Sequence, residues 1–311
     1  MRALIVTNMY PTPATPARGS FVSDQVKALS DLPGVEVEVF AFEPGGGSPY
    51  PRAARALRQR YRGGEFDVIH AHFGLTAWPA LVLRGAPHVV TLHGTDLVNP
   101  RSRLVTLAAL PFVDLVAPVS TSLVQLLPPR LVDGKVAVLP CGVAVDRFRP
   151  IPRAEARARL GLDADVRYLL FPADPARSEK RFDRAQLVAQ EHRLLALGRV
   201  PPTEVPYWVN AADAVLVTSE RESFGLSVLE ALACDVPVLA TDVGIAPEVL
   251  AAVPGTYCGP FSVPDWLAAL EAVLADPDPR VHGRHVAVRY SAHRMAERVL
   301  AAWRELLESG P

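Results

Sequence analysis

Short apolar runs that end in polar loops recur along the first half of the chain. They alternate with stretches of helical character, and the expected strands are 3–7, 35–42, 66–72, 88–94, 115–120 and 136–142. Continuous apolar runs of this length are typical of strands that are buried on both faces of a parallel sheet. Ser23 and Asp24 are a candidate N-cap for a helix that runs to Leu32. The alternation predicts a parallel sheet covered by helices.

A second alternating series follows Pro150-Ile151-Pro152. Its expected strands are 168–173, 193–198, 214–219, 236–242 and a short one near Thr256 and Tyr257, and Ala292 to Leu307 forms an amphipathic helix. The sequence therefore predicts an α/β protein of two doubly wound domains, residues 1–150 and 151–291, which face a cleft. The helix within 292–311 is expected to pack back toward the first domain. Ligands of such folds bind at the carboxyl ends of strands, where the strand order reverses.

Composition sets limits on the partners of this chain. Half of the 311 residues are apolar, about a fifth are charged, and the net charge is −1, so no strong field attracts nucleic acid. Residues 1–150 carry 15 Lys+Arg and 11 Asp+Glu, whereas residues 151–311 carry 17 and 22. A mildly basic first half is compatible with an anionic ligand or surface.

Three scattered cysteines, Cys141, Cys234 and Cys258, follow no metal-ligand spacing. We expect reduced thiols, no zinc site and a cytoplasmic protein. The amino-terminal residues are polar too early for a signal peptide, and no run of about 18 uncharged apolar residues occurs.

Candidate residues of the first half follow the expected strands. Gly19 is either a position where backbone approaches a ligand or an ordinary turn glycine. His70 and His72 share one face of a strand, and His93 ends the next strand in TLHGTD, with Asp96 just beyond. These four side chains are either metal ligands or, without a short His-x3-His frame, hydrogen-bonded polar groups. His93 is the candidate for a role in function.

In the second half, FPADPARSEKRFD (171–183) leaves a strand and enters a helix. Arg177 and Lys180 lie at this junction, where free N–H groups add positive partial charge. Two cations beside a helix start make a diphosphate site, whereas the alternative is a solvated basic loop. Only three lysines occur against 29 arginines, which favours a specific role for Lys180.

Two glutamates frame the stretch SERESFGLSVLEALACDVPVLATD (219–242). Glu222 is either part of a capping box with Ser219 or a ligand of the site, and Glu230 lies on a helix that is apolar nearly all round. Carboxylates beside a phosphate site accept hydrogen bonds from neutral hydroxyls, such as those of sugar and ribose. Eight helical residues rise about 12 Å, more than the roughly 5–9.5 Å between the carboxylates of a glycosidase. We therefore expect the pair to bracket a sugar nucleotide lengthwise.

These motifs resemble a retaining glycosyltransferase of the GT-B fold, family four. The most specific part is the Glu222-x7-Glu230 frame with Phe224-Gly225-Leu226, followed by ALACDVPVLATDVG. The supporting pieces are Pro13…Gly19-Ser-Phe-Val, VIHAHFG, TLHGTD, VSTSL, VAVLPCGVAVDRFRP, the Arg177…Lys180 loop and NAADAVLVTS.

The resemblance implies a donor, UDP- or GDP-sugar, in the second domain and a hydroxyl acceptor in the first. It implies that Arg177 and Lys180 hold the diphosphate, that Glu222 accepts sugar hydroxyls and that Glu230 binds the ribose. His93 would lie beside the transferred sugar and Gly19 under the phosphates or the acceptor. The amides after Ser223, those of Phe224, Gly225 and Leu226, would meet sugar or phosphate. The resemblance implies front-face transfer that requires no metal.

The chain departs from the family pattern in two places. Phe171-Pro172-Ala173 stands where a glycine is usual, and residues 184–206 are too short for the usual strand, helix and strand, so the second domain is shortened. Two alternatives stay open: a non-catalytic pseudo-transferase that binds a sugar nucleotide, and a sugar-nucleotide epimerase on the same fold. Five arginines between Arg52 and Arg62 form either a peripheral membrane contact, on the inner face, or a solvated helix face.

Overall fold

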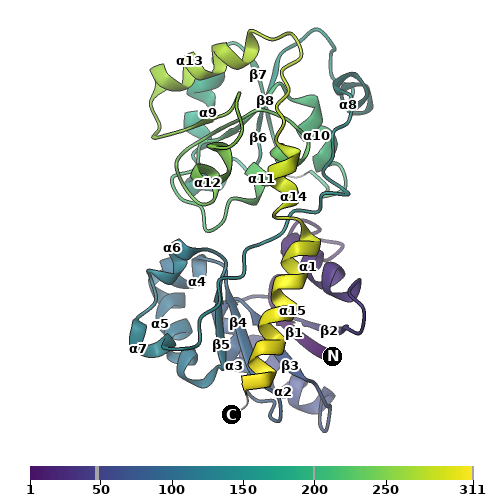
Figure 1. Cartoon of the computed structure of the whole chain (residues 1–311), viewed down its shortest axis with the longest axis vertical. Coiled ribbons are helices and arrows are strands. Elements are labelled where there is room, and N and C mark those ends of the chain that lie inside the picture. The colour runs from purple at the N-terminus through teal and green to yellow at the C-terminus, as the bar shows by residue number, and fades with distance from the viewer. Residues whose placement is uncertain (46–48, 199, 310–311) are drawn as a thin grey trace. The chain divides into compact units, whose positions relative to one another are not determined.

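The chain folds into two compact units in a computed structural model that describes residues 1–45, 49–198 and 200–309 (Figure 1). Unit 1 comprises Met1–Gly142 and the C-terminal residues from Ala292, and unit 2 comprises Val143–Ser291. The chain therefore passes between the units twice, after Gly142 and after Ser291. The cleft expected between two domains stays a prediction, and the last two residues of the expected C-terminal segment lie outside the described residues.

Unit 1 is built on a parallel sheet with the strand order β2-β1-β3-β4-β5. The strands are β1 (Arg2–Thr7), β2 (Glu36–Ala41), β3 (Val68–His72), β4 (His88–Leu92) and β5 (Leu115–Pro118). β1, β3, β4 and β5 have almost every residue buried, although neighbouring side chains point to opposite faces. Both faces of the sheet are therefore covered, as the continuous apolar runs predict.

Short helices connect the strands of unit 1. They are α1 (Ser20–Ser30), α2 (Pro49–Arg60), α3 (Ala77–Ala80), α4 (Thr95–Val98), α5 (Pro100–Ala109), α6 (Thr121–Val124) and α7 (Pro129–Val132), with 3-10 turns η1 (Gly74–Thr76) and η2 (Leu110–Phe112). The C-terminal helix α15 (Ala292–Ser309) lies beside α1 (Figure 1). Val299 and Trp303 of α15 share a core with Leu29 of α1 and Ile5 of β1.

Two expectations for unit 1 are wrong. Residues 136–142 form no strand: they pair with β5 through a single bridge, Val116 to Val136, and one further backbone bond, from the Leu139 amide to the Pro118 carbonyl. Ser23 and Asp24 do not cap α1, which already begins at Ser20, because Gly19 precedes it with a left-handed φ of 64°.

Unit 2 repeats the design with the strand order β10-β9-β8-β6-β7. Its strands are β6 (Tyr168–Phe171), β7 (Arg193–Ala196), β8 (Ala214–Val217), β9 (Val238–Ala240) and β10 (Tyr257–Cys258), all in parallel pairings. Its helices are α8 (Arg153–Leu160), α9 (Phe182–Ala189), α10 (Val205–Ala211), α11 (Leu226–Ala233), α12 (Ala246–Leu250), α13 (Val263–Leu274) and α14 (Arg284–Val288), with the 3-10 turn η3 (Ser178–Lys180). All five strands expected here are present.

One buried carboxylate ties the amino-terminal edge of this second sheet together. Asp213 is 1% exposed and accepts from Arg157 at 2.8 Å, from Arg167 at 2.9 Å and from the Tyr168 amide at 2.8 Å. Arg153 adds a contact at 3.3 Å. The Asp of the NAAD stretch is therefore a structural anchor that joins α8 to the starts of β6 and β8.

Candidate functional site

The strand order of unit 2 reverses at β6, which has β7 on one side and β8 on the other. Loops that leave the carboxyl ends of two strands at such a point diverge and leave room for a ligand. The loop after β6 carries Lys180, and the loop after β8 carries Glu222. These are two of the residues that the sequence singles out.

The two side chains meet directly. Lys180 Nζ lies 2.6 Å from Glu222 Oε1, and the side chains are 15% and 9% exposed. The Ser219 hydroxyl donates to the same Oε1 at 2.7 Å. Partial burial strengthens such charge-assisted bonds.

Thr218 fixes the position of the lysine. Its hydroxyl lies 3.1 Å from the Lys180 carbonyl oxygen and 2.9 Å from that of Arg181, which has a left-handed φ of 55°. The end of β8 therefore holds the loop that follows β6, and the ammonium group is pre-positioned beside the carboxylate.

Arg177 does not join this pair in the structure. Its guanidinium donates twice to Glu179 Oε1, at 2.9 and 2.7 Å, and its side chain is 57% exposed. Surface pairs of this kind are weak, so a diphosphate can displace Glu179 from Arg177.

The turn from Glu222 to Gly225 leads into α11, which begins only at Leu226. Gly225 is the residue before the helix, with a φ of 97°, and no side chain caps the first turn. The amide groups at this helix start are therefore available to an anion. Neither glutamate caps α11, so the capping-box reading of Ser219 and Glu222 is wrong: Ser219 bonds to the carboxylate instead.

The loop after β9 supports this turn. The Ile245 amide donates to the Phe224 carbonyl at 2.7 Å, and a Cβ on Gly244 would lie 2.5 Å from that oxygen and 2.8 Å from the Glu222 Cβ. Gly244 has a φ of 62°, so both its conformation and its surroundings require glycine. Phe224 itself is 6% exposed, so only its backbone is available to a ligand.

Glu230 is half-buried on α11, in the last turn of the helix. Because residues 222–225 precede the helix, the two glutamates do not share one continuous helix, and the 12 Å estimate from helical rise is wrong. Ser223 and Leu226, at the turn and the helix start, are also half-buried.

In unit 1 the strand order reverses at β1, and His93 follows β4. His93 Nε2 lies 3.1 Å from His72 Nδ1, and the two rings stack with centroids 5.3 Å apart. The Phe21 ring lies 4.8 Å from that of His93. His93 is half-buried, so part of it reaches the surface at the carboxyl edge of the sheet.

His70 and His72 extend this contact into the core. The Trp303 indole donates to His70 Nδ1 at 3.2 Å, and His70 Nε2 lies 2.6 Å from the Thr91 hydroxyl. Burial lowers the pKa of His72 to about 3, and it lowers the pKa of His70 and of His93 well below the usual value. All three rings are therefore neutral at pH 7, and a neutral His93 offers hydrogen bonds without a net charge.

Asp96 joins the loops after β3 and β4. Its carboxylate accepts from the amides of Gly74, His93 and Gly94 at 3.2, 3.0 and 2.7 Å, and it is fully buried. Burial raises its pKa, and these backbone bonds oppose that shift. Within the ranges that the structure describes, no group of three or more His, Cys, Asp and Glu side chains is placed to hold a metal.

Gly19 has a structural reason to be glycine. A Cβ at this position would lie 2.1 Å from the Met9 carbonyl oxygen, in the loop after β1. The packing of α1 on that loop requires glycine whether or not a ligand is present, and contact of Gly19 with a ligand stays a prediction.

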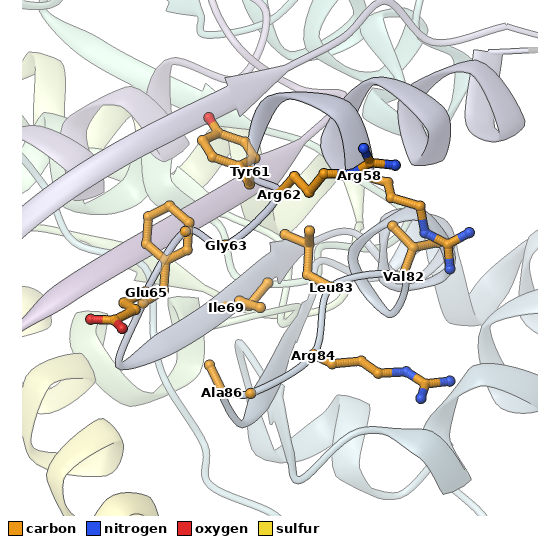
Figure 2. A pocket seen from close by; sticks show the side chains of 13 residues that line it. Arg58, Tyr61, Arg62, Gly63, Glu65, Ile69, Val82, Leu83, Arg84 and Ala86 are labelled. Carbon is orange, nitrogen blue, oxygen red and sulfur yellow. The ribbon is translucent and has the colours of Figure 1, made fainter.

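A cavity of about 700 Å³ lies at the opposite edge of the unit 1 sheet, among residues that precede β3 and β4. Figure 2 shows Arg58, Arg62 and Arg84 extending to one side of this cavity and Glu65 to the other. This edge holds the amino ends of the strands, away from His93. No helix in the described part of the chain combines the length and apolarity needed to cross a bilayer.

Four contributors to these sites were not assigned from the sequence: Thr218, Ser219 as a carboxylate donor, Gly244 and Trp303. Gly244 lies at the end of the stretch ALACDVPVLATDVG. The sequence therefore showed the motif, but it did not show that Gly244 supports the Glu222–Gly225 turn. Trp303 lies 233 residues from His70, and no local pattern links them.

Known families and structures resemble both units. Residues 13–147 match the family model for glycosyltransferase family 4, and residues 161–291 match that for glycosyl transferases group 1. The D-inositol 3-phosphate glycosyltransferase of Thermobispora bispora is 30% identical over 93% of this chain and 89% of its own length. That alignment spans 387 positions, so the relative carries segments that this 311-residue chain lacks.

Solved structures agree in fold. Sucrose-phosphate synthase from Thermosynechococcus elongatus has a TM-score of 0.78, 19% identity and coverage of 100% of both chains. Anabaena HepE, in complex with UDP and glucose, has a TM-score of 0.67, 18% identity and coverage of 98% of both chains. These likenesses confirm the GT-B fold, with two Rossmann-like domains. The chain therefore belongs to the family four glycosyltransferases and is an enzyme that transfers a sugar.

Proposed function

We propose that the enzyme moves a sugar from a nucleoside diphosphate sugar to a hydroxyl acceptor, with retention at the anomeric carbon and without a metal. The observation that carries the proposal is the Lys180–Glu222 pair, 2.6 Å apart at the point where the strand order reverses and beside the uncapped start of α11. A cation, a carboxylate and free amides together match a diphosphate that is linked to a polyol.

Relatives support the choice of substrate. Those similar in sequence are named D-inositol 3-phosphate glycosyltransferase, and Anabaena HepE has been solved with UDP and glucose and with UDP-glucose. We infer a UDP- or GDP-sugar as the donor.

The donor binds by replacing two ion pairs of the unliganded site. An incoming diphosphate draws Lys180 from Glu222, and it draws Arg177 from Glu179. The freed Glu222 accepts bonds from sugar hydroxyls, and Glu230 binds those of the ribose. The cations and the α11 amides then stabilise the negative charge that grows on the leaving diphosphate.

His93 lies beside the transferred sugar in this proposal. Its neutral ring offers a hydrogen bond to a sugar hydroxyl without competing for the diphosphate. The leaving phosphate takes the proton of the acceptor hydroxyl, so no side chain acts as a covalent nucleophile.

The test compares nucleotide binding and turnover in three variants. Lys180→Ala is expected to lower kcat about 100-fold or more with UDP-glucose or GDP-mannose, because it removes stabilisation of the leaving group. Glu230→Ala is expected to weaken UDP or GDP binding. Lys27→Ala, an exposed lysine on α1, is the matched control and should behave as wild type.

Each outcome separates the alternatives. Wild-type kinetics in both site variants would refute the site. Melting shifts with nucleotides but no turnover or hydrolysis of any donor would indicate a pseudo-transferase. Interconversion of two sugar nucleotides without an acceptor would indicate an epimerase.

We also propose that the basic face of α2 contacts an anionic membrane surface at the cytoplasmic side. Arg52, Arg55, Arg58, Arg60 and Arg62 are all exposed, and among the described residues only Arg60 of these has an ion pair, with Glu38 at 3.1 Å. Flotation with phosphatidylglycerol vesicles tests this: an Arg52→Gln/Arg55→Gln variant should float less than wild type. Equal flotation would indicate a solvated helix face.

A further inference from the structure

A second cavity of unit 1, of about 740 Å³, lies at the carboxyl edge of the sheet. Its lining includes Phe73, just after β3, and Thr95, two residues after His93. We call it the edge cavity. Because Asp96 bonds to the amides of Gly74 and His93, the loop that lines this cavity and the loop that carries His93 are one connected structure.

We propose that the edge cavity binds the apolar body of an amphiphilic acceptor, which carries an anionic group besides its reacting hydroxyl. The inference rests on the proposed transferase function and names the acceptor class. A free sugar or a polyol is then a poor acceptor, because it cannot fill an apolar cavity of this size.

The walls of the edge cavity are aromatic and aliphatic. Tyr50, Phe73, Leu75, Trp78 and Val105 line it, and no acidic side chain of the described residues does. Three of these five are aromatic rings, which provide large rigid contact areas for an apolar ligand.

Phe73 is held in a strained backbone conformation at this wall. Its φ is 83°, which is rare for a bulky residue. The Phe73 amide donates to the Thr91 carbonyl at 2.9 Å, while the amide and hydroxyl of Thr76 donate to the Phe73 carbonyl at 2.9 and 2.7 Å. Strained backbone conformations that are held by several surrounding hydrogen bonds are found at ligand sites. Here the strained conformation places the Phe73 ring on the cavity wall.

Most polar groups of the cavity are already occupied. Asn99 Oδ1 accepts from the amides of Arg101 and Ser102, and the Ser102 hydroxyl donates to the Thr95 carbonyl. The guanidinium of Arg101 has no ion pair with any side chain in the described ranges. It lies in the first turn of the ten-residue helix α5, where the helix dipole also favours an anion.

The apolar surface continues beyond the cavity. Trp78, Leu104, Val105 and Phe112 are 39%, 73%, 41% and 62% exposed, and the Trp78 and Phe112 rings lie 6.1 Å apart. Single exposed apolar residues are ordinary, but Trp78 and Val105 on the cavity wall, with the Phe112 ring next to that of Trp78, form a group that marks a binding surface. A body longer than the cavity, such as an acyl chain, would lie along this surface.

Binding of 8-anilinonaphthalene-1-sulfonate, an aromatic sulfonate that matches the cavity, provides the first test. Wild type should enhance its fluorescence at one site, and Val105→Glu should weaken binding at least tenfold. Leu187→Glu, on α9 of unit 2, is the matched control because Leu187 is 55% exposed and lies outside this surface.

Arg101→Gln should weaken binding of the sulfonate but not of the neutral probe N-phenyl-1-naphthylamine. Unchanged binding of the sulfonate by both cavity variants would overturn the proposal.

Competition then identifies the apolar body. Displacement by decyl phosphate alone indicates an alkyl chain, and displacement by 4-nitrophenyl phosphate indicates an aromatic body. Equal displacement by inorganic phosphate would contradict the role of the cavity walls.

Transfer assays with UDP-glucose complete the test. Octyl glucoside or 4-nitrophenyl glucoside should accept sugar at least tenfold better than glucose or D-inositol 3-phosphate, and Trp78→Ala should remove that preference. If glucose and D-inositol 3-phosphate are the better acceptors, the inference fails while the transferase function stands. If the wild type binds neither UDP nor GDP in the same preparation, the transferase function itself fails.

Discussion

At the scale of single residues, the Lys180–Glu222 contact has two consequences for the unliganded enzyme. Each charge neutralises the other in a partly buried setting, which lowers the cost of keeping both ionised. In the proposed mechanism, the contact also keeps the carboxylate from sugar hydroxyls until an anion competes for the lysine. In that mechanism, this one 2.6 Å contact links donor binding to formation of the sugar site.

The stacked histidines predict a specific loss of stability in acid. Burial lowers the pKa of His72 to about 3, whereas an unfolded histidine has a pKa of about 6.5. Between these values the unfolded chain binds a proton that the folded chain does not, so stability falls as the pH falls. A single such residue contributes a loss of about 2 kcal/mol between pH 7.5 and pH 5.0.

His72→Phe keeps a ring in the stack but removes this titration. Urea unfolding of wild type and variant at both pH values, followed by tryptophan fluorescence, measures the effect. The loss of stability in acid should be about 2 kcal/mol smaller in the variant. An equal loss in both proteins would show that His72 is not held neutral.

At the scale of elements, the Glu222–Gly225 turn depends on the loop after β9. Gly244→Ala forces a methyl group against the Phe224 carbonyl, at 2.5 Å, so the turn must move. We expect at least a tenfold loss of affinity for UDP, measured by calorimetry.

Gly134→Ala is the control for the backbone cost alone. Gly134 has a φ of 70°, but a Cβ there meets nothing within 4 Å. Both variants should lose about 1–2 kcal/mol of stability from the left-handed conformation. Only Gly244→Ala should lose UDP affinity; wild-type affinity in that variant would show that the turn does not shape the site.

The strands and the main site loops could be predicted from the sequence because their signals are local. Apolar runs identified ten of the eleven expected strands, and the exception, 136–142, has apolar residues but pairs with β5 only in part. The Lys180 and Glu222 loops were predicted to lie together because both follow strands of one parallel sheet. The start of α11 was not predicted. The sequence between Glu222 and Glu230 resembles a helix, but the helix begins only at Leu226, after Gly225.

Contacts made between distant segments could not be read from the sequence. Trp303 and His70 illustrate this, as does the strain of Phe73, which depends on Thr76 and Thr91 rather than on its own residue type. Asn, Gly and Asp are the usual residues at positive φ, so a phenylalanine gives no signal.

At the scale of the whole molecule, the enzyme consists of two units, each built on a five-stranded parallel sheet. Different buried contacts hold each unit together. α15 ties the end of the chain to unit 1 through Trp303, and Asp213 joins α8 to the sheet of unit 2. Each unit is therefore held by a buried contact that joins a helix to its sheet.

Asp213→Ala should destabilise unit 2 by about 3–5 kcal/mol, because Arg157, which is 5% exposed, would keep its buried charge without its partner. Thermal unfolding measures this. Glu297→Ala, which breaks only exposed pairs on α15, should change the melting temperature little. Similar small shifts in both variants would contradict the anchoring role of Asp213.

The most direct test of the proposed donor site at Lys180 and Glu222 is a crystal structure of the enzyme with UDP-glucose. We expect Lys180 Nζ to leave Glu222 for the diphosphate, the carboxylate of Glu222 to accept from glucose hydroxyls, and the amides at the start of α11 to face the ligand. A diphosphate bound away from residues 177–180 and 222–226, with the Lys180–Glu222 contact unchanged, would contradict the proposed site.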